Sequence, residues 1–525
     1  MSEMLKKDGV IRLADKKTGI LAMVFSRMSL VLLLLGVQLF LLFSVFLWFR
    51  GYLPQIFGGT LAFTFVMVLY LVNSELDPTG KITWLIIVML VPFFGAAFYW
   101  FTQADLGHRL MKKRLLHILN ISRNRIPQEE ESAREIRKAN PESYALHRFI
   151  NRTGCYPIYR NTSVEFFALG EDKFERMLEE LEKAKHFIFM EYFIIAEGLM
   201  WGRILEVLAR KATEGVEVRV MYDGTCEFAL LPHDYPKRLA ALGIKAKVFS
   251  RLAPVISTHY NYRDHRKILV IDGNTAFNGG VNIGDEYINK RSPFGHWKDT
   301  ALMLKGDAVR SFTLMFLQLW NITERAEDFG SYLSYDPGSH PQAKGFVMPY
   351  SDIPLDRERV GEMVYIDMLN RAQRYVHIMT PYLILDAELE NALKFAAMRG
   401  VEVKIILPGI PDKKPVYALA KTHFAALISA GIKIYLYTPG FIHAKEFISD
   451  DNKAVVGTIN LDYRSLYHHF ECASYMYETE CIADIERDFL ETLEKSRLVG
   501  IEELNKRSLG EKLVGIVLKS LAPLL

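Results

Sequence analysis

A pattern of five residues, His-x-Lys-x4-Asp-x6-Gly-x2-Asn, occurs twice in this chain of 525 residues. The first copy comprises His265, Lys267, Asp272, Gly279 and Asn282, and the second, 178 positions later, comprises His443, Lys445, Asp450, Gly457 and Asn460. One match to the His-Lys-Asp part arises by composition in roughly a few per cent of chains this long, whereas two copies with the same tail are not accidental. The repeat therefore predicts two related half-sites.

These residue types suit the chemistry of a phosphodiester. A lysine beside an imidazole favours an anionic substrate and stabilises negative charge that builds up in the transition state. Histidine can attack phosphorus and can also carry protons, so one histidine can act as nucleophile and the other as acid toward the leaving oxygen. Asn282, Asn460 and Thr458 are predicted to donate hydrogen bonds to the phosphate oxygens. The spacing does not determine which histidine attacks.

Each motif is expected on or beside a β-strand, because short apolar runs follow Lys267 and precede Gly457. Residues two apart on a strand face the same side, so each histidine should project together with the lysine of its motif. Asp272 and Asp450 complete the catalytic motifs but lie at odd spacing, directly before turn-forming residues. A structural or orienting role is therefore expected for these two carboxylates.

Composition excludes some functions and indicates others. A zinc site is not expected, because two histidines would need further ligands at short spacing and the four cysteines show none. The net charge of +3 argues against a nucleic-acid partner. Hydrophobic residues make up 50% of the chain and its mean hydropathy is +0.08. These values are high for a soluble protein and indicate membrane segments.

The apolar residues concentrate near the N-terminus. A basic segment, 1–28, precedes a predicted transmembrane region, 29–102, with apolar runs at 30–49, 56–72 and 82–101. Basic residues flank the region on both sides, so the number of spans stays open, and the short second run is the candidate for a re-entrant or interfacial segment. Residues 103–140 are predicted to form a linker that includes a charged, solvated stretch.

The rest of the chain is predicted to form a duplicated α/β unit, 141–334 and 346–508, divided by a loop-rich stretch at 335–345. Each half repeats the order helix, strand, helix, strand. The predicted elements are Lys173–Ala184, His186–Phe193, Gly202–Thr213 and Val216–Tyr222, then Val360–Ala372, Tyr375–Met379, Asp386–Arg399 and Val401–Leu407. The tail 509–525 is expected to form an amphipathic helix that packs on the domain or contacts a membrane.

The two motifs resemble the signature of the phospholipase D superfamily. More narrowly, the chain from about residue 30 to 505 resembles bacterial cardiolipin synthases of the membrane-anchored type. The segments that carry the resemblance are HRKILVID (265–272), FNGGVNIGD (277–285), GHWKDT (295–300), LYTPGFIHAK (436–445) and GTINLDYRS (457–465).

The resemblance implies two homologous phospholipase D-like α/β halves that form one composite site, preceded by N-terminal transmembrane helices in a multi-pass protein of the bacterial cell membrane. It also implies transfer of a phosphatidyl group between two phosphatidylglycerol molecules, with release of glycerol, through a phosphatidyl-histidine and without a metal or other cofactor. His265 is then the expected nucleophile and His443 the general acid and base. Glu471 is expected to orient His443, and Asp299 to orient His265.

An alternative within the superfamily is a phospholipase D hydrolase or another phosphatidyltransferase, such as a phosphatidylserine synthase. These activities differ in whether water or an alcohol reaches the phosphorylated enzyme, and no motif in this sequence identifies the acceptor. An inactive scaffold is disfavoured, because it would have no use for two complete motifs. The chain departs from the family pattern at His469, where asparagine is common, and in having three apolar runs. Its oligomeric state is not predicted.

Overall fold

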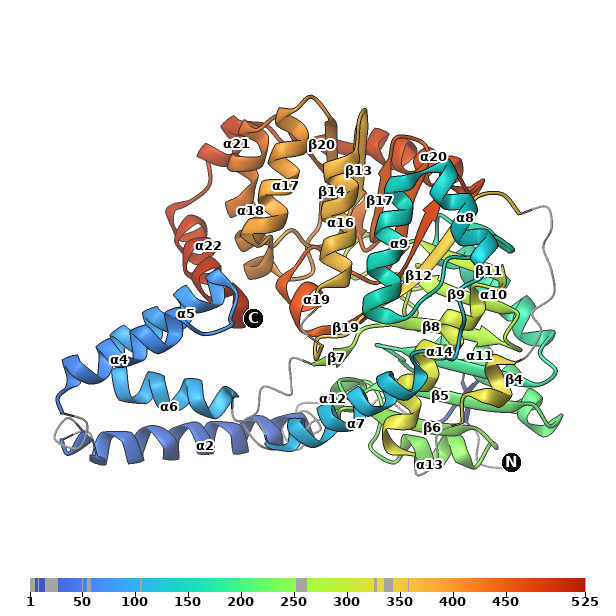
Figure 1. The fold of residues 1–525 in the computed structure, drawn as a ribbon. Helices are drawn as coiled ribbons and strands as arrows, with labels where there is room; N and C mark the ends of the chain where they lie inside the picture. The colour runs from blue at the N-terminus through green and yellow to red at the C-terminus, as the bar shows by residue number, and fades with distance from the viewer. Residues whose placement is uncertain are drawn as a thin grey trace.

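The computed structural model describes residues 5–7, 9–14, 27–49, 51–53, 58–103, 106–251, 262–324, 328–334, 343–356 and 358–524. Two α/β units lie against each other, and helices from the N-terminal region extend to one side (Figure 1). Most of the predicted basic segment 1–28 and of the predicted loop 335–345 lies outside the described residues.

The first unit is built on a seven-stranded sheet with the order β3-β11-β9-β8-β4-β5-β6. Its strands are β3 (Thr162–Phe167), β4 (Phe187–Tyr192), β5 (Glu217–Asp223), β6 (Lys245–Phe249), β8 (Lys267–Ile271), β9 (Thr275–Gly279) and β11 (Ala301–Gly306). The helices are α10 (Gly170–Glu182), α11 (Leu199–Thr213), α12 (Cys226–Ala229), α13 (Tyr235–Ala240), α14 (Val309–Trp320) and α15 (Gly330–Leu333). Every residue of β4 and β8 is buried, as expected for strands covered on both faces.

The second unit repeats this strand order as β12-β19-β18-β17-β13-β14-β15, with β20 added at the edge. The strands are β12 (Phe346–Asp352), β13 (Tyr375–Met379), β14 (Glu402–Pro408), β15 (Lys433–Tyr437), β17 (Glu446–Ser449), β18 (Lys453–Gly457), β19 (His469–Tyr477) and β20 (Ser496–Leu498). The helices are α16 (Val360–Arg371), α17 (Ala387–Met398), α18 (Lys414–Ser429), α19 (Tyr463–Tyr467), α20 (Cys481–Glu494) and α21 (Ile501–Asn505). The shared order confirms the predicted duplication of an α/β unit.

The predicted helices and strands of both halves are confirmed to within about three residues at each end, which is the usual uncertainty of element boundaries. The helical and strand patterns were strong here because most residues of these strands are buried.

Two short strand pairings join the units. β10 (His296–Lys298) of the first unit pairs in parallel with β16 (Gly440–Ile442) of the second. β7 (Arg263–Asp264) of the first unit pairs in parallel with the start of β19, at His469 and Phe470. Each pairing brings a motif histidine, which directly follows β7 or β16, next to a strand of the other unit.

The N-terminal part contains a hairpin, β1 (Leu5–Lys7) with β2 (Val10–Arg12), and then a series of helices. These are α2 (Arg27–Phe49), α4 (Thr60–Val72), α5 (Pro78–Leu90), α6 (Pro92–Gln103), α7 (Leu106–Ser122), α8 (Glu130–Ala139) and α9 (Pro141–Gly154). The predicted linker 103–140 thus holds α7 and α8.

Among the described residues, none of the helices combines the length and the apolar character needed to span a bilayer. The described helices therefore do not support the expected transmembrane helices and multi-pass arrangement. In the third apolar run the reason is visible, because Pro92 divides it into α5 and α6. The 13 residues of α5 reach about 20 Å at about 1.5 Å per residue, short of a hydrocarbon core of about 30 Å.

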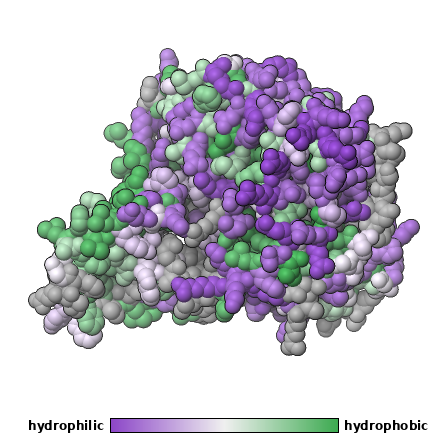
Figure 2. Space-filling view, in the orientation of Figure 1, coloured by the Kyte–Doolittle hydropathy of each residue, from purple (hydrophilic) through white to green (hydrophobic). Residues whose placement is uncertain are grey.

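The predicted C-terminal helix is confirmed as α22 (Leu509–Leu521). One face packs on the second unit, where Gly515 lies against the backbone of Ala418, and the Thr83 hydroxyl of α5 donates to the carbonyl of Ser520 (2.7 Å). Figure 2 shows that apolar side chains gather on the surface of this region, over α4, α5 and α22. The exposed ones include Leu61, Phe65, Met89, Leu90, Leu509, Leu513 and Ile516.

Candidate active site

The motif aspartates lie where the motif strands end. The carboxylate of Asp272 accepts three backbone N–H groups at the start of β4, from residues 185–187, at 2.7–2.8 Å. Asp450 accepts the N–H groups of residues 373–375 at the start of β13, at 2.8–3.1 Å. Both aspartates have positive φ, 49° and 55°. These contacts support the predicted structural role, since each carboxylate ties the end of its motif strand to the neighbouring strand.

The motif histidines are oriented by carboxylates, but the pairing is the reverse of the prediction. Nδ1 of His265 lies 2.9 Å from Glu471 on β19, and Nδ1 of His443 lies 2.6 Å from Asp299. Because an ionised carboxylate only accepts, we assign the proton to Nδ1 in both rings. The expectation that Glu471 orients His443 and Asp299 orients His265 is therefore wrong. The strand pairs between the units are the cause: the His265 N–H donates to the carbonyl of Phe470 and the His443 N–H to that of Lys298, 2.9 and 2.7 Å.

The two lysines fold back onto the histidines of their own motifs. Lys267 Nζ donates to the carbonyl oxygen of His265 at 2.5 Å, and Lys445 makes the same contact with His443. Burial lowers the pKa of Lys267 to about 8 and that of Lys445 to about 7, although Glu471 and Asp299 oppose the shift. Both ammonium groups are thus held inside the site, where a phosphate would stabilise their charged forms.

The charges of the two half-sites act on each other. Burial, followed by the charges of Lys267 and Lys445, holds the pKa of His265 well below its usual range. Burial and Lys445 lower the pKa of His443 to about 4, against the opposing effect of Asp299. A lysine of the second unit therefore influences the histidine of the first, which is what a composite site requires. The lowered pKa values favour the neutral form of both imidazoles while no anion is bound.

The predicted phosphate-binding residues have different surroundings. Thr458 was expected to contact the phosphate. Its hydroxyl instead donates to Glu471 and accepts the N–H of Cys472 at 3.0 Å, so Thr458 positions Glu471. Asn282 accepts the N–H of Ile194 at 3.0 Å and donates to the Tyr287 hydroxyl at 2.8 Å. Asn460 is buried, and its Oδ1 has no hydrogen-bond partner among the described residues.

Aromatic rings line the site and were not predicted from the sequence. Phe193 stands edge-on to His265 with ring centroids 4.9 Å apart, and Tyr287 stands edge-on to His443 at 5.5 Å. Trp297 packs on His443 at 5.3 Å, and His469 packs on His265 at 5.2 Å. Of these residues, only His469 was noted from the sequence, because it departs from the family pattern.

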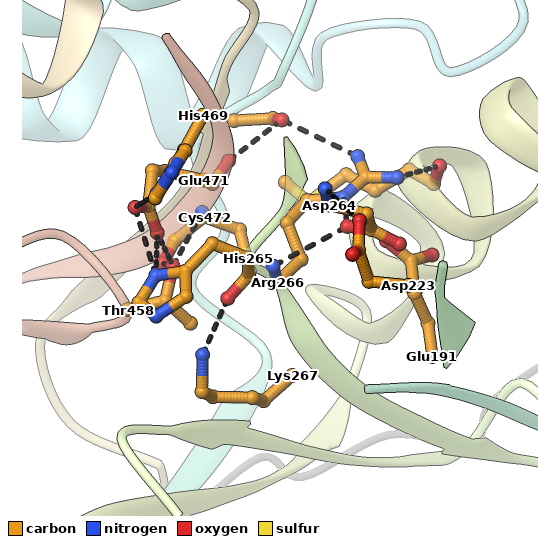
Figure 3. A network of polar contacts seen from close by, with 12 residues as sticks. Glu191, Asp223, Asp264, His265, Arg266, Lys267, Thr458, His469, Glu471 and Cys472 are labelled. Atoms are coloured by element: carbon orange, nitrogen blue, oxygen red, sulfur yellow. Dashed lines mark hydrogen bonds and ion pairs between the residues drawn. The ribbon is translucent and has the colours of Figure 1, made fainter. Parts of the chain in front are cut away.

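A buried ion network supports the first half-site (Figure 3). The Arg266 side chain is fully buried, and its Nε donates to Glu191 at 2.5 Å and lies 3.6 Å from Asp264. The Asp264 N–H donates in turn to Asp223 at 3.0 Å. Burial raises the pKa of both Glu191 and Asp264, while Arg266 lowers it. The sequence held one sign of this network. The residue between the motif histidine and lysine is arginine in the first copy (His-Arg-Lys) and alanine in the second (His-Ala-Lys).

Two α/β units of equal strand order, with a His-Lys pair of each meeting carboxylates of the other, define a phospholipase D-like enzyme. A family model described as "Cardiolipin synthase, PLD-like domain" matches residues 177–320 and 365–493, and a "Phospholipase_D-nuclease N-terminal" model matches 62–102. A cardiolipin synthase 2 of Bacillus anthracis is 34% identical over 469 residues, 88% of this chain and 90% of that protein. The chain belongs to the bacterial cardiolipin synthases of the phospholipase D superfamily and is a phosphatidyltransferase.

Two further comparisons frame this assignment. An uncharacterized protein of Streptococcus mutans serotype c is 56% identical over 458 residues, which are 87% of this chain and 99% of that protein. The crystal structure of phosphatidylserine synthase from Haemophilus influenzae Rd KW20 superposes with a TM-score of 0.56 at 15% identity, covering 73% of this chain and 98% of that chain. At this identity the second likeness shows the fold alone.

Proposed function

We propose that the protein makes cardiolipin from two molecules of phosphatidylglycerol and releases glycerol. The observation that carries the proposal is the pair of imidazoles, each held through Nδ1 by a carboxylate of the other unit. This arrangement leaves the Nε2 of each ring free to act on a substrate. The cardiolipin synthases among the relatives support the choice of substrate.

In the first step, Nε2 of His265 attacks phosphorus, and the bond from phosphorus to the glycerol oxygen breaks. His443 gives its proton to that oxygen, and glycerol leaves. In the second step, a hydroxyl of another phosphatidylglycerol attacks the phosphatidyl-histidine while His443 takes its proton. The phosphorus–nitrogen bond breaks, which frees His265. A bound phosphodiester raises the pKa of His443 and so lets it carry the proton, while Lys267, Lys445 and the amides of Asn282 and Asn460 stabilise the phosphate oxygens.

The same proposal includes association with a membrane surface, since both substrates are lipids. The exposed apolar side chains of α4, α5 and α22 form a surface suited to the acyl region of a bilayer. Binding to the surface would keep the site near its substrates.

The test uses the full chain with vesicles of pure phosphatidylglycerol. Cardiolipin and glycerol are the expected products, whereas phosphatidic acid and glycerol without cardiolipin would identify a hydrolase and overturn the proposal. H265A and H443A should each lower turnover by at least about a thousand-fold. The partly buried His468 provides the control, since H468N should remain active.

The assignment of the nucleophile needs a separate experiment. Phosphatidylglycerol labelled in its phosphate, quenched during turnover, should leave label on the peptide that contains His265. Label on the His443 peptide alone would reverse the two roles.

A further inference from the structure

His469 occupies a place in the first half-site that the proposed reaction does not explain. It is buried, with 8% of its surface exposed, and neither of its ring nitrogens has a hydrogen-bond partner in the part of the chain that the structure describes. A buried polar group without a partner destabilises the fold unless a ligand satisfies it. Its nearest acidic neighbour is Glu471, whose Oε1 lies 3.6 Å from the Nδ1 of His469. Figure 3 shows both side chains beside His265.

We propose that His265, His469 and Glu471 form a site for a zinc ion that switches the enzyme off. One ligand atom from each of these residues lies within 4.8 Å of the other two. Bonds of about 2.0–2.1 Å in a tetrahedral zinc site place neighbouring ligand atoms about 3.3 Å apart. The distance from His265 Nδ1 to Glu471 Oε1 is 2.9 Å and that from His469 Nδ1 to the same oxygen is 3.6 Å, each within about 0.4 Å of that value, and the third pair of ligand atoms lies within 4.8 Å.

Two imidazoles and one carboxylate, with a fourth position open to water, make a donor set that Zn²⁺ favours. This site could not be predicted from the sequence, because the three residues come from both halves of the chain and lack the short spacing of a zinc motif. The proposed function requires that a lipid phosphate reaches His265, so a hydrated cation can reach the same site.

Binding would block the reaction through the tautomer of His265. A neutral imidazole carries one N–H, which in the free enzyme sits on Nδ1 and donates to Glu471. A zinc ion on Nδ1 takes the lone pair there, so the proton must sit on Nε2. Nε2 then has no lone pair with which to attack phosphorus. This inhibitory role rests on the proposed function, whereas zinc binding itself does not.

The second half-site cannot form the same site. Trp297 takes the place beside His443 that His469 takes beside His265, with ring centroids 5.3 and 5.2 Å apart. The indole N–H is a donor only and does not ligate metals. The zinc site is therefore confined to the half that carries the proposed nucleophile.

The test measures Zn²⁺ binding to the chelator-treated full chain by calorimetry without lipid, and Co²⁺ binding by visible absorption. Wild type and H468N, the matched control next in sequence, should bind a single ion and give the strong Co²⁺ bands of a tetrahedral site. H469N and H469Q should lose at least about tenfold in affinity. Wild type without binding, or both His469 variants binding like wild type, would overturn the site.

Activity in phosphatidylglycerol vesicles gives the second readout. Zn²⁺ should inhibit cardiolipin formation by wild type, with recovery after chelation, and should not inhibit the cardiolipin formation that H469N retains. Inhibition of H469N to the same extent as wild type would overturn the switch. Zinc binding in a protein that makes no cardiolipin would refute the proposed function alone, and cardiolipin synthesis without zinc binding would refute this inference alone.

Discussion

The two half-sites share one backbone plan and differ in what surrounds it. In each, the motif histidine follows a short strand paired with the other unit, donates to a carboxylate of that unit, and carries its lysine folded onto its own carbonyl. In the first, Arg266 anchors a buried ion network, and the equivalent residue in the second is Ala444. A duplicated frame thus holds the two histidines alike, while their neighbours differ.

A second difference concerns the orienting acids. Glu471 is held by the Thr458 hydroxyl, whereas the residue equivalent to Thr458 is Gly280, where a Cβ would lie 2.0 Å from the Asp299 carboxylate. The shorter acid therefore sits where the threonine side chain would be. His265, the proposed nucleophile, is thus oriented by a glutamate that receives an extra hydrogen bond. His443, the proposed general acid, is oriented by the shorter aspartate.

The largest effects are expected from the crossed carboxylates. E471Q and D299N should each lower turnover by about 10²–10⁴-fold, because an amide no longer holds its histidine in the reactive tautomer. Nitrogen NMR of labelled histidine tests the crossing directly. E471Q should shift the His265 resonances and leave those of His443 nearly unchanged, and D299N should do the opposite. The reverse pattern would show that each acid orients the histidine of its own unit and would contradict the crossed pairing.

The next effect is on stability and concerns the first half-site alone. R266M should lower the free energy of unfolding by about 3–5 kcal/mol, because it leaves the carboxylates of Glu191 and Asp264 buried without their cation. Denaturant unfolding measures this. The double variant R266M/E191M should recover part of the loss, and an R266M protein as stable as wild type would show that the network is dispensable.

A smaller effect is expected at Thr458. T458V should lower turnover about 10–100-fold, since Glu471 loses the hydroxyl that holds it, while T458S keeps the hydrogen bond and should stay near wild type. Steady-state cardiolipin synthesis compares the two variants. Equal activity of T458V and T458S would show that the hydrogen bond from Thr458 to Glu471 does not matter, and the proposed difference between Glu471 and Asp299 would fall.

The pH dependence should separate the two lysines by about one unit. Both pKa values are lowered, so each lysine is charged at low pH and loses its proton as the pH rises, Lys445 through about 7 and Lys267 through about 8. For the free enzyme, loss of the two charges should therefore lower kcat/KM about tenfold per pH unit between pH 7 and 8, and about a hundredfold per unit above pH 8. K445R should move the fall that begins near pH 7 to higher pH, and K267R should do the same for the fall that begins near pH 8. A profile that either variant leaves unchanged would assign the fall to another group.

Much of the fold was predictable because the chain repeats itself. The elements from Lys173 to Tyr222 and from Val360 to Leu407 have strong local patterns, and the duplicated motif indicated two equivalent units. The predicted transmembrane helices are not supported by the described helices, and one reason is local, since hydropathy alone does not show that one helix ends before Pro92 and another begins there.

The orienting pairs were not predictable in the same way. Glu471 follows His443 in the chain and Asp299 follows His265, so proximity in sequence favoured pairs within each half. The parallel pairings β7 with β19 and β10 with β16 join residues far apart in sequence, and they exchange the partners. Local spacing carries no information about such contacts.

The sequence by itself determined the chemistry: two His-Lys pairs, their supporting aspartates and a duplicated α/β frame. Only the tertiary structure decided which acid serves which histidine, that Thr458 holds Glu471, and that His469 stands beside His265 without a hydrogen-bond partner among the described residues. The physical reason is that residue type and spacing specify what a strand presents, whereas the neighbours of a side chain depend on which strands pair across the two units.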